Sequence, residues 1–188
     1  MCDEPADLPN SSDCHRVDLD RLIGEFYPVQ SGVTSLGKFD PCTIVPGKFD
    51  ALLRHEHHMT VTVESHHGRP VDVVVHRYHT TDHWYVREIT LVLSGTNEVV
   101  QYGIVRFDTT AVAPEVWRRI ESRTVPLGRV LIEHDVLRQV HLCGLWEIQV
   151  GRPMARLLGC NVGKRTFGRT ALIDCNGRPA IELLEVVV

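Results

Sequence analysis

The chain has 188 residues, enough for a single domain with its own hydrophobic core. Twenty Lys and Arg against 24 Asp and Glu give a net charge of −4 at pH 7, so the chain has no overall positive field to gather a nucleic acid. Its apolar runs are far shorter than the ~20 residues that a transmembrane helix needs. We therefore expect a soluble domain with no nucleic-acid partner and no membrane span.

The six cysteines do not follow the spacing of a metal or redox motif, because the sequence has no Cys-x-x-Cys. The N-terminus, MCDEPADLPN, is acidic, whereas a secretory signal begins with basic residues and continues with an apolar stretch. These features predict a cytoplasmic protein with reduced thiols.

Residues 1–47 differ in composition from the rest of the chain. Residues 1–20 are polar and acidic and contain two prolines, so we expect a loose arm. Apolar residues at helical spacing follow from Leu19, and Pro28 ends this short helix. We predict an N-terminal extension with one short helix over 1–47 and the main domain over 48–188.

The main domain contains separate groups of strands and helices. Helical spacing of apolar residues predicts helices over 48–53, 113–122 and 133–142. Alternating or continuous apolar residues predict strands over 59–65, 71–79, 84–93, 98–107, 170–175 and 179–187. The last two strands are joined by Asn176-Gly177, a strong hairpin signal. This order indicates an α+β fold, a single antiparallel sheet of about six strands with helices packed on one face.

Strand alternation places a charge on two otherwise apolar faces. Arg87 shares its face of 84–93 with aromatic and aliphatic residues, and Glu185 shares its face of 179–187 with aliphatic residues. An unpaired charge there would cost several kcal/mol. Three arrangements remain open: an ion pair between the two residues, exposure at an edge, or a ligand. The planar guanidinium binds both oxygens of a carboxylate, so Arg87 is a candidate for binding an acid.

A turn at 124–131, TVPLGRVL, is a second candidate for ligand contact. Pro126 fixes its φ angle and Gly128 has unusual backbone freedom. The backbone amides of Leu127 and Gly128 are therefore candidates to face a ligand oxygen.

In this order, these features resemble the chorismate lyase (chorismate–pyruvate lyase) family. The family's aromatic-hydrophobic-Arg-Glu strand is matched by WYVREI (84–89), and its Pro-Leu-Gly turn by TVPLGR (124–129). Its Gly-x-Pro turn and final acidic strand are matched by GRPAIELLE (177–185). The resemblance covers roughly residues 48–188 and implies an antiparallel sheet with a ligand buried beneath flaps. It also implies conversion of chorismate to 4-hydroxybenzoate and pyruvate without a cofactor.

The resemblance also assigns roles to individual residues. It implies that Arg87 binds the ring carboxylate, that the main chain of Leu127 binds the same end of the ligand, and that Glu185 bonds the ring hydroxyl. A fourth contact is the main chain of Met59. Glu182 is a second candidate for the acid, although alternation places it on the opposite face from Glu185.

Chorismate is a dicarboxylate whose ring becomes aromatic when the enolpyruvyl group leaves, so the protein mainly needs to bind, orient and desolvate it. On this hypothesis Arg87 and Glu185 position the ring. A second basic residue should hold the enolpyruvyl carboxylate, and Arg129, Arg138 and Arg169 all remain candidates. Whether a side chain or the enolpyruvyl group itself takes the ring hydrogen also stays open.

A metal site is one alternative, because eight histidines lie between His55 and His83. However, HEHH at 55–58 lacks the HExxH spacing, and His76 and His79 would lie on opposite faces of a strand. We therefore predict no metal.

A non-catalytic ligand-binding domain is the main alternative to an enzyme. Effector-binding domains of bacterial transcription regulators have the same type of fold and resemble the lyase without its chemistry. They normally follow a helix-turn-helix domain, whereas the first 47 residues here predict one short helix. A third hypothesis is a lyase or isomerase that converts a related cyclohexadiene acid to a different aromatic product.

Overall fold

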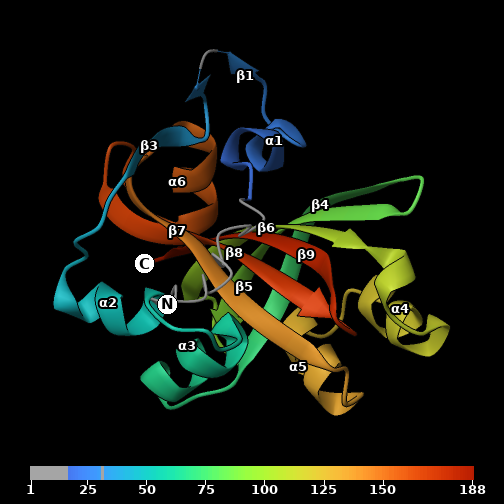
Figure 1. Cartoon of the computed structure of the whole chain (residues 1–188). Coiled ribbons are helices and arrows are strands. Elements are labelled where there is room, and N and C mark those ends of the chain that lie inside the picture. Colours follow the sequence, from blue (N-terminus) through green and yellow to red (C-terminus); the bar gives the residue numbers. More distant parts are fainter. Residues whose placement is uncertain (1–16, 31) are drawn as a thin grey trace, which may run out of the picture.

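One antiparallel sheet of nine strands forms the centre of the computed structural model, which describes residues 17–30 and 32–188 (Figure 1). The strand order is β1-β2-β3-β7-β8-β9-β6-β5-β4. The strands are β1 Val29–Gln30, β2 Val33–Thr34, β3 Gly37–Pro41, β4 Val71–Thr81, β5 Trp84–Leu93, β6 Val99–Asp108, β7 Arg138–Val150, β8 Arg165–Cys175 and β9 Arg178–Val187. The α+β class and the single antiparallel sheet are confirmed. The sheet has nine strands because β1, β2, β3 and β7 join five of the six predicted strands, the sixth being a helix.

Helices cover both faces of the sheet. They are α1 Leu19–Gly24, α2 Gly47–Leu53, α3 Met59–His67, α4 Pro114–Glu121, α5 Leu127–Glu133 and α6 Arg152–Leu158, with a short 3₁₀ turn at Thr109–Ala111. In Figure 1, α1 and α6 lie on the upper side, where they pack on Val86, Tyr102 and Leu184. The other four helices pack on the opposite face. The expectation that helices cover one face is therefore corrected, because β5, β6 and β9 are apolar on both faces and both need cover.

The described part of the expected N-terminal extension, residues 17–30 and 32–47, packs against the rest of the fold. Strand β3 pairs with β7, and Leu22 and Ile23 of α1 are buried in the core that α1 shares with β6 and β9. Of the loose arm expected over 1–20, residues 1–16 lie outside the described residues.

Residues 59–65, for which alternation predicts a strand, belong to helix α3. Met59, Thr60 and Val63 are buried and lie on one helical face. Gly68 ends the helix in the left-handed conformation, with φ of 62°, and its N–H donates to the carbonyl of Glu64. The β-branched residues favour a strand locally, but packing of one helical face outweighs that preference.

The helix predicted over 133–142 is also wrong. Helix α5 ends at Glu133, Asp135 turns the chain with φ of 49°, and β7 begins at Arg138. Strand β7 bonds β8 along most of its length and β3 at its C-terminal end. This pairing on two sides outweighs the local helical spacing, since tertiary contacts commonly override propensity.

The other predicted elements are confirmed within a few residues. The predicted helices at 48–53 and 113–122 correspond to α2 and α4, and the remaining predicted strands to β4, β5, β6, β8 and β9. Asn176 and Gly177 have φ values of 54° and 80°. Two successive positive φ angles are what a two-residue type I′ hairpin turn requires.

A buried carboxylate fastens the segment that follows α1 to the middle of strand β5. Glu88 accepts hydrogen bonds from the hydroxyls of Tyr27 (2.6 Å) and Tyr102 (2.8 Å) and from Nε of Arg77 (2.8 Å). Arg77 also donates to the carbonyl of Phe26 at 3.2 Å. Burial opposes ionisation, but these hydrogen bonds outweigh it and lower the pKa of Glu88. Glu88 therefore stays charged and fully partnered on the face opposite Arg87.

No helix in the described ranges is long and apolar enough to cross a membrane. Cys42, Cys160 and Cys175 are free thiols, and Cys2 and Cys14 lie outside the described residues. Burial raises the pKa of Cys175 to about 11, so this thiol is protonated at neutral pH.

Replacing Tyr27 by Phe should destabilise the protein by about 1.5–3 kcal/mol, because it removes a hydrogen bond to a buried charged group. Urea unfolding measures this loss. Tyr78→Phe is the matched control, since Tyr78 is half exposed and its ring packs on Arg123. An equal loss in both variants would contradict the role of Glu88.

Candidate functional site

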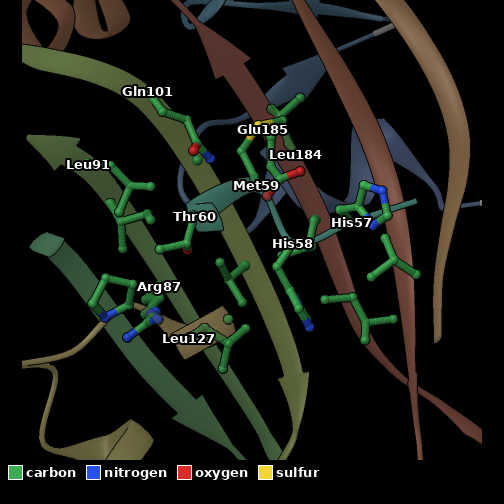
Figure 2. A pocket seen from close by; sticks show the side chains of 18 residues that line it. His57, His58, Met59, Thr60, Arg87, Leu91, Gln101, Leu127, Leu184 and Glu185 are labelled. Atoms are coloured by element: carbon green, nitrogen blue, oxygen red, sulfur yellow. The ribbon is translucent and has the colours of Figure 1, made fainter. Parts of the chain in front are cut away.

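A pocket lies between the sheet and the N-terminal ends of α3 and α5 (Figure 2). Its walls include the five main site residues predicted from the sequence, namely Met59, Arg87, Leu127, Gly128 and Glu185. The other lining residues are His57, His58, Thr60, Ile89, Leu91, Gln101, Gly103, Val105, Pro126, Val140, Ile173, Leu183 and Leu184. Most of the walls are apolar, so the few polar groups are the candidates for specific contacts.

Arg87 is buried in this pocket without a partner. The residue is 1% exposed, yet Nε, Nη1 and Nη2 make no hydrogen bond within the described residues. The polar neighbour of Arg87 is Tyr85 on the same face of β5, whose hydroxyl raises the pKa of Arg87 through its charge and its hydrogen-bonding capacity. The two groups do not reach the geometry of a hydrogen bond, because neither has a hydrogen-bond partner among the described residues. Burial outweighs the effect of Tyr85 and lowers the pKa of Arg87, although a guanidinium still carries its charge at neutral pH. A buried unpaired cation is unfavourable by several kcal/mol, so the site is suited to an anion.

Glu185 faces the same pocket, but its partner is Arg169. Nε of Arg169 donates to Oε2 of Glu185 at 2.7 Å, and the two residues lie opposite each other on β8 and β9. The ion pair between Arg87 and Glu185, one of the arrangements that the sequence left open, is not formed. The pairing of Glu185 with Arg169 leaves Arg87 available to a ligand.

Each nitrogen of the Arg169 guanidinium already donates a hydrogen bond within the protein. Nη1 donates to the carbonyls of His55 (2.7 Å) and Leu53 (3.4 Å) and contacts Nδ1 of His55 (3.2 Å). Nη2 donates to the carbonyl of His57 at 3.2 Å. These bonds hold the linker between α2 and α3 against the sheet, so the role of Arg169 is to support the pocket wall.

The other two candidate arginines also have partners. Arg129 pairs with Glu64 and does not line the pocket. Nε of Arg138 donates to Nε2 of His58 at 2.8 Å, and its Nη1 donates to the carbonyl of Val136 at 2.9 Å. Arg138 therefore contacts the pocket side chain of His58 and Arg169 contacts that of Glu185, but neither arginine lines the pocket itself.

Two helix N-termini contribute to the pocket. Helix α3 begins at Met59 and α5 at Leu127. The first backbone bonds of these helices are donated by Thr62 and Arg129, so the preceding amides lack a partner within their helix. Such amides favour a negatively charged group. Figure 2 shows Leu127 toward the same end of the pocket as Arg87.

His58 was missed by sequence reasoning, although it lies in the HEHH segment. Its ring packs where Gly128 has no side chain, since a Cβ on Gly128 would lie 3.2 Å from Cγ of the ring. Burial, followed by the nearby charges of Arg138 and Arg169, lowers the pKa of His58 to about 4. His58 is therefore neutral at pH 7 and accepts the hydrogen bond from Arg138.

Gln101 was also missed, although strand alternation could have revealed it. Gln101 lines the pocket with Gly103 and Val105 of the same strand. Its Oε1 is buried and receives no hydrogen bond from any described residue. Gln101 and Glu185 lie toward the opposite end of the pocket from Arg87 (Figure 2). A ligand with an acidic group at one end and a donor at the other would satisfy both ends.

Glu182, the second candidate acid, lies on the opposite face of the sheet, as alternation predicts. It pairs with Arg21 and, at 3.4 Å, with Nη1 of Arg106. It does not line the pocket. Glu182 therefore helps to hold α1 and is no longer a candidate for the acid.

The histidines that suggested a metal site bond to separate partners. His55 contacts Arg169, His58 accepts from Arg138, and His76 bonds Thr90 at 2.9 Å. Over residues 17–30 and 32–188, no group of three His, Cys, Asp or Glu side chains is placed to hold a metal ion.

Comparison with known proteins identifies relatives of the fold. No family model and no curated protein matches the chain. Among solved structures, the chain is similar to the effector domain of PhnF from Mycobacterium smegmatis, with a TM-score of 0.53 and 11% identity over 70% of this chain and 88% of that one. The crystal structure of PhnF itself matches with a TM-score of 0.51 and 11% identity, over 68% of this chain and 62% of that one.

These structures share the fold of the chain. The first is described as the effector domain of PhnF, and the second is PhnF itself. The fold class that the resemblance implied is thereby confirmed. At 11% identity the likeness concerns the fold, and the function has to be argued from the pocket.

His58 should titrate near pH 4 in the folded protein, well below the 6.5 of an unperturbed histidine. The unfolded chain binds this proton more readily, so the free energy of unfolding should rise with pH between about 4 and 6.5 and this contribution should be complete above that range. NMR titration of the ring and urea unfolding across this range measure both effects. In His58→Gln, which keeps an acceptor for Arg138, the pH dependence should be weaker. An unchanged dependence would contradict the assignment.

Proposed function

We propose that this chain is a ligand-binding domain of the effector type that binds a small aromatic carboxylic acid. The observation that carries the proposal is the buried guanidinium of Arg87, which has no hydrogen-bond partner among the described residues. A carboxylate supplies the missing negative charge and two acceptor oxygens for parallel hydrogen bonds. The first amides of α3 and α5 offer further donors for the same anion.

The remaining walls favour a single ring with a donor group at its far end. Ile89 and Leu91 provide apolar contacts, and Gly103 leaves the middle of β6 without a side chain. About 40 Å³ of the pocket is open to the centre of a water-sized sphere, whereas a cavity that binds benzene has ~150 Å³, so the walls have to move outward to admit a single ring. At the far end, Oε1 of Gln101 and the carboxylate of Glu185 can accept a hydrogen bond from a ring hydroxyl. 4-Hydroxybenzoate has these features and is the appropriate first probe.

One observation favours binding over catalysis. The similar part of PhnF is an effector domain, and its fold is the fold of this chain. The hydrogen bond of 2.7 Å from Arg169 holds Glu185 in one orientation, which suits the orienting role that both functions give to this residue.

Replacing Arg87 by Met should abolish the binding of 4-hydroxybenzoate and leave the unliganded protein equally or more stable. Met is of similar length and removes the unpaired charge, and replacing buried charges by apolar residues is commonly neutral or stabilising by about 1–4 kcal/mol. Calorimetric titration and thermal unfolding measure the two effects.

Arg118→Met is the matched control for this experiment. Arg118 is exposed on α4 and lies outside the pocket, so the same change in charge should leave binding unchanged. Wild-type affinity in Arg87→Met would contradict the proposal. Mass spectrometry of small molecules extracted from the purified wild-type protein would identify a bound acid independently of the chosen probe.

Chorismate lyase activity is the second candidate function. It is supported by the presence of Arg87, Leu127 and Glu185 in one pocket, the residues to which the resemblance assigns substrate contacts. On this hypothesis Arg87 fixes the ring carboxylate, and Glu185 orients the carbon that bears the hydroxyl. Loss of pyruvate then follows from aromatisation of the ring, without a cofactor.

Incubation with chorismate distinguishes the two functions. A lyase should release equal amounts of 4-hydroxybenzoate and pyruvate, and Arg87→Gln should lower the rate by at least ~100-fold, because it removes the charged contact to the substrate. A binding domain should leave chorismate unchanged while binding 4-hydroxybenzoate. Mass spectrometry of the products would also reveal a different aromatic acid, the outcome expected of a related lyase or isomerase.

A further inference from the structure

A second cavity lies directly beside the pocket. It is an open cleft, and His57, His58 and Val140 line both cavities. Arg87 lines the pocket but not the cleft, and Arg138 lines the cleft but not the pocket. His57 and His58 therefore form a wall between an arginine on the inside and an arginine on the outside.

The cleft is much larger than the pocket. About 630 Å³ of the cleft is open to the centre of a water-sized sphere, against about 40 Å³ of the pocket. Arg87 is 1% exposed, so a ligand has to displace part of the surrounding wall to reach it. The wall of His57, His58 and Val140 separates the pocket from this wide cleft.

Arg138 gives the cleft a contact for an anion. Among the described residues, it is the one Lys or Arg that lines the cleft. Nε and Nη1 bond His58 and Val136, and Nη2 makes no hydrogen bond in the described ranges. Glu56 and Asp135 also line the cleft, so an anion should be held there more weakly than beside Arg87.

His58 is suited to act as the movable part of the wall. Its ring is neutral, and the hydrogen bond that orients it comes from Arg138 at 2.8 Å. A carboxylate that binds Arg138 competes for the same donor and frees the ring to rotate. The same arginine would thus both receive the ligand and release the side chain in its path.

We propose that the cleft is an outer binding site for the same carboxylate ligand, with Arg138 as its cationic contact, and that rotation of His58 passes the ligand inward to Arg87. This inference rests on the proposed function of the pocket. The outer site does not include Arg87, so its binding of the ligand can be tested in a variant that lacks Arg87.

The first test uses Arg87→Met, with Arg87→Gln as a second variant should the first not fold. NMR titration with 4-hydroxybenzoate should shift the backbone amides of 136–140 with a dissociation constant in the millimolar range, about 1–20 mM. The shifts should disappear in Arg87→Met/Arg138→Gln and persist in Arg87→Met/Arg118→Gln, which carries the same net charge. Absence of these shifts in the single variant, or their persistence when Arg138 is replaced, would overturn the outer site.

The second test measures the role of His58 by stopped-flow binding of 4-hydroxybenzoate. His58→Ala should raise the association and dissociation rates by the same factor, about 5-fold or more, because it removes a barrier that both directions cross. A change confined to the dissociation rate would overturn the gating role. If wild-type protein binds no aromatic acid, the proposed function fails. If it binds through Arg87 but neither test succeeds, only the outer site and its gate fail.

Discussion

The main constraint on this structure is that the guanidinium of Arg87 is buried without a hydrogen-bond partner among the described residues. A small domain has a net stability of about 5–15 kcal/mol, so a buried charge without a partner is a large disadvantage in the unliganded state. The fold nevertheless holds the residue rigidly, since β5 is bonded on one side to β4 and on the other to β6. On the opposite face of β5, the carboxylate of the next residue, Glu88, accepts three hydrogen bonds. One strand thus carries a charge that the protein satisfies and a charge that it leaves to a ligand.

The two buried arginines have different roles, because one stabilises the pocket wall and the other is available to bind a ligand. Arg169 is 0% exposed and bonds Glu185 together with three backbone carbonyls of the linker before α3. Arg87 is equally buried and has no bond to any described residue. The first arginine fixes the wall and the acid of the pocket, and the second is left for binding. Both are needed, because a free cation is useful only if the surrounding wall does not collapse onto it.

The position of the pocket suits both of the proposed functions, the binding of an aromatic acid and lyase activity. The sheet supplies Arg87, Gln101 and Glu185 from three neighbouring strands, and the short helices α3 and α5 cover them. Binding of an aromatic acid and release of pyruvate from chorismate need the same carboxylate contact. They differ in what happens after the ligand is bound, which depends on a few side chains and on how the wall opens.

The sequence by itself determined the placement of charge on the strands. Alternation has a strict period of two, so it correctly separates Arg87 from Glu88 and Glu185 from Glu182 without knowledge of the neighbouring strands. The order of the motifs also brought Met59, Leu127 and Gly128 into the predicted site, and all three line the pocket.

Tertiary structure decided the rest, because pairing and packing depend on residues that are distant in the chain. Local preference predicts a strand at 59–65 and a helix at 133–142, but packing of α3 and the two-sided pairing of β7 reverse both. The partner of Glu185 could not be predicted either. Arg87 and Arg169 are both positive, and only the order of β5, β6, β9 and β8 places Arg169 directly opposite the acid and Arg87 two strands away. That register leaves Arg87 as the cation for a ligand.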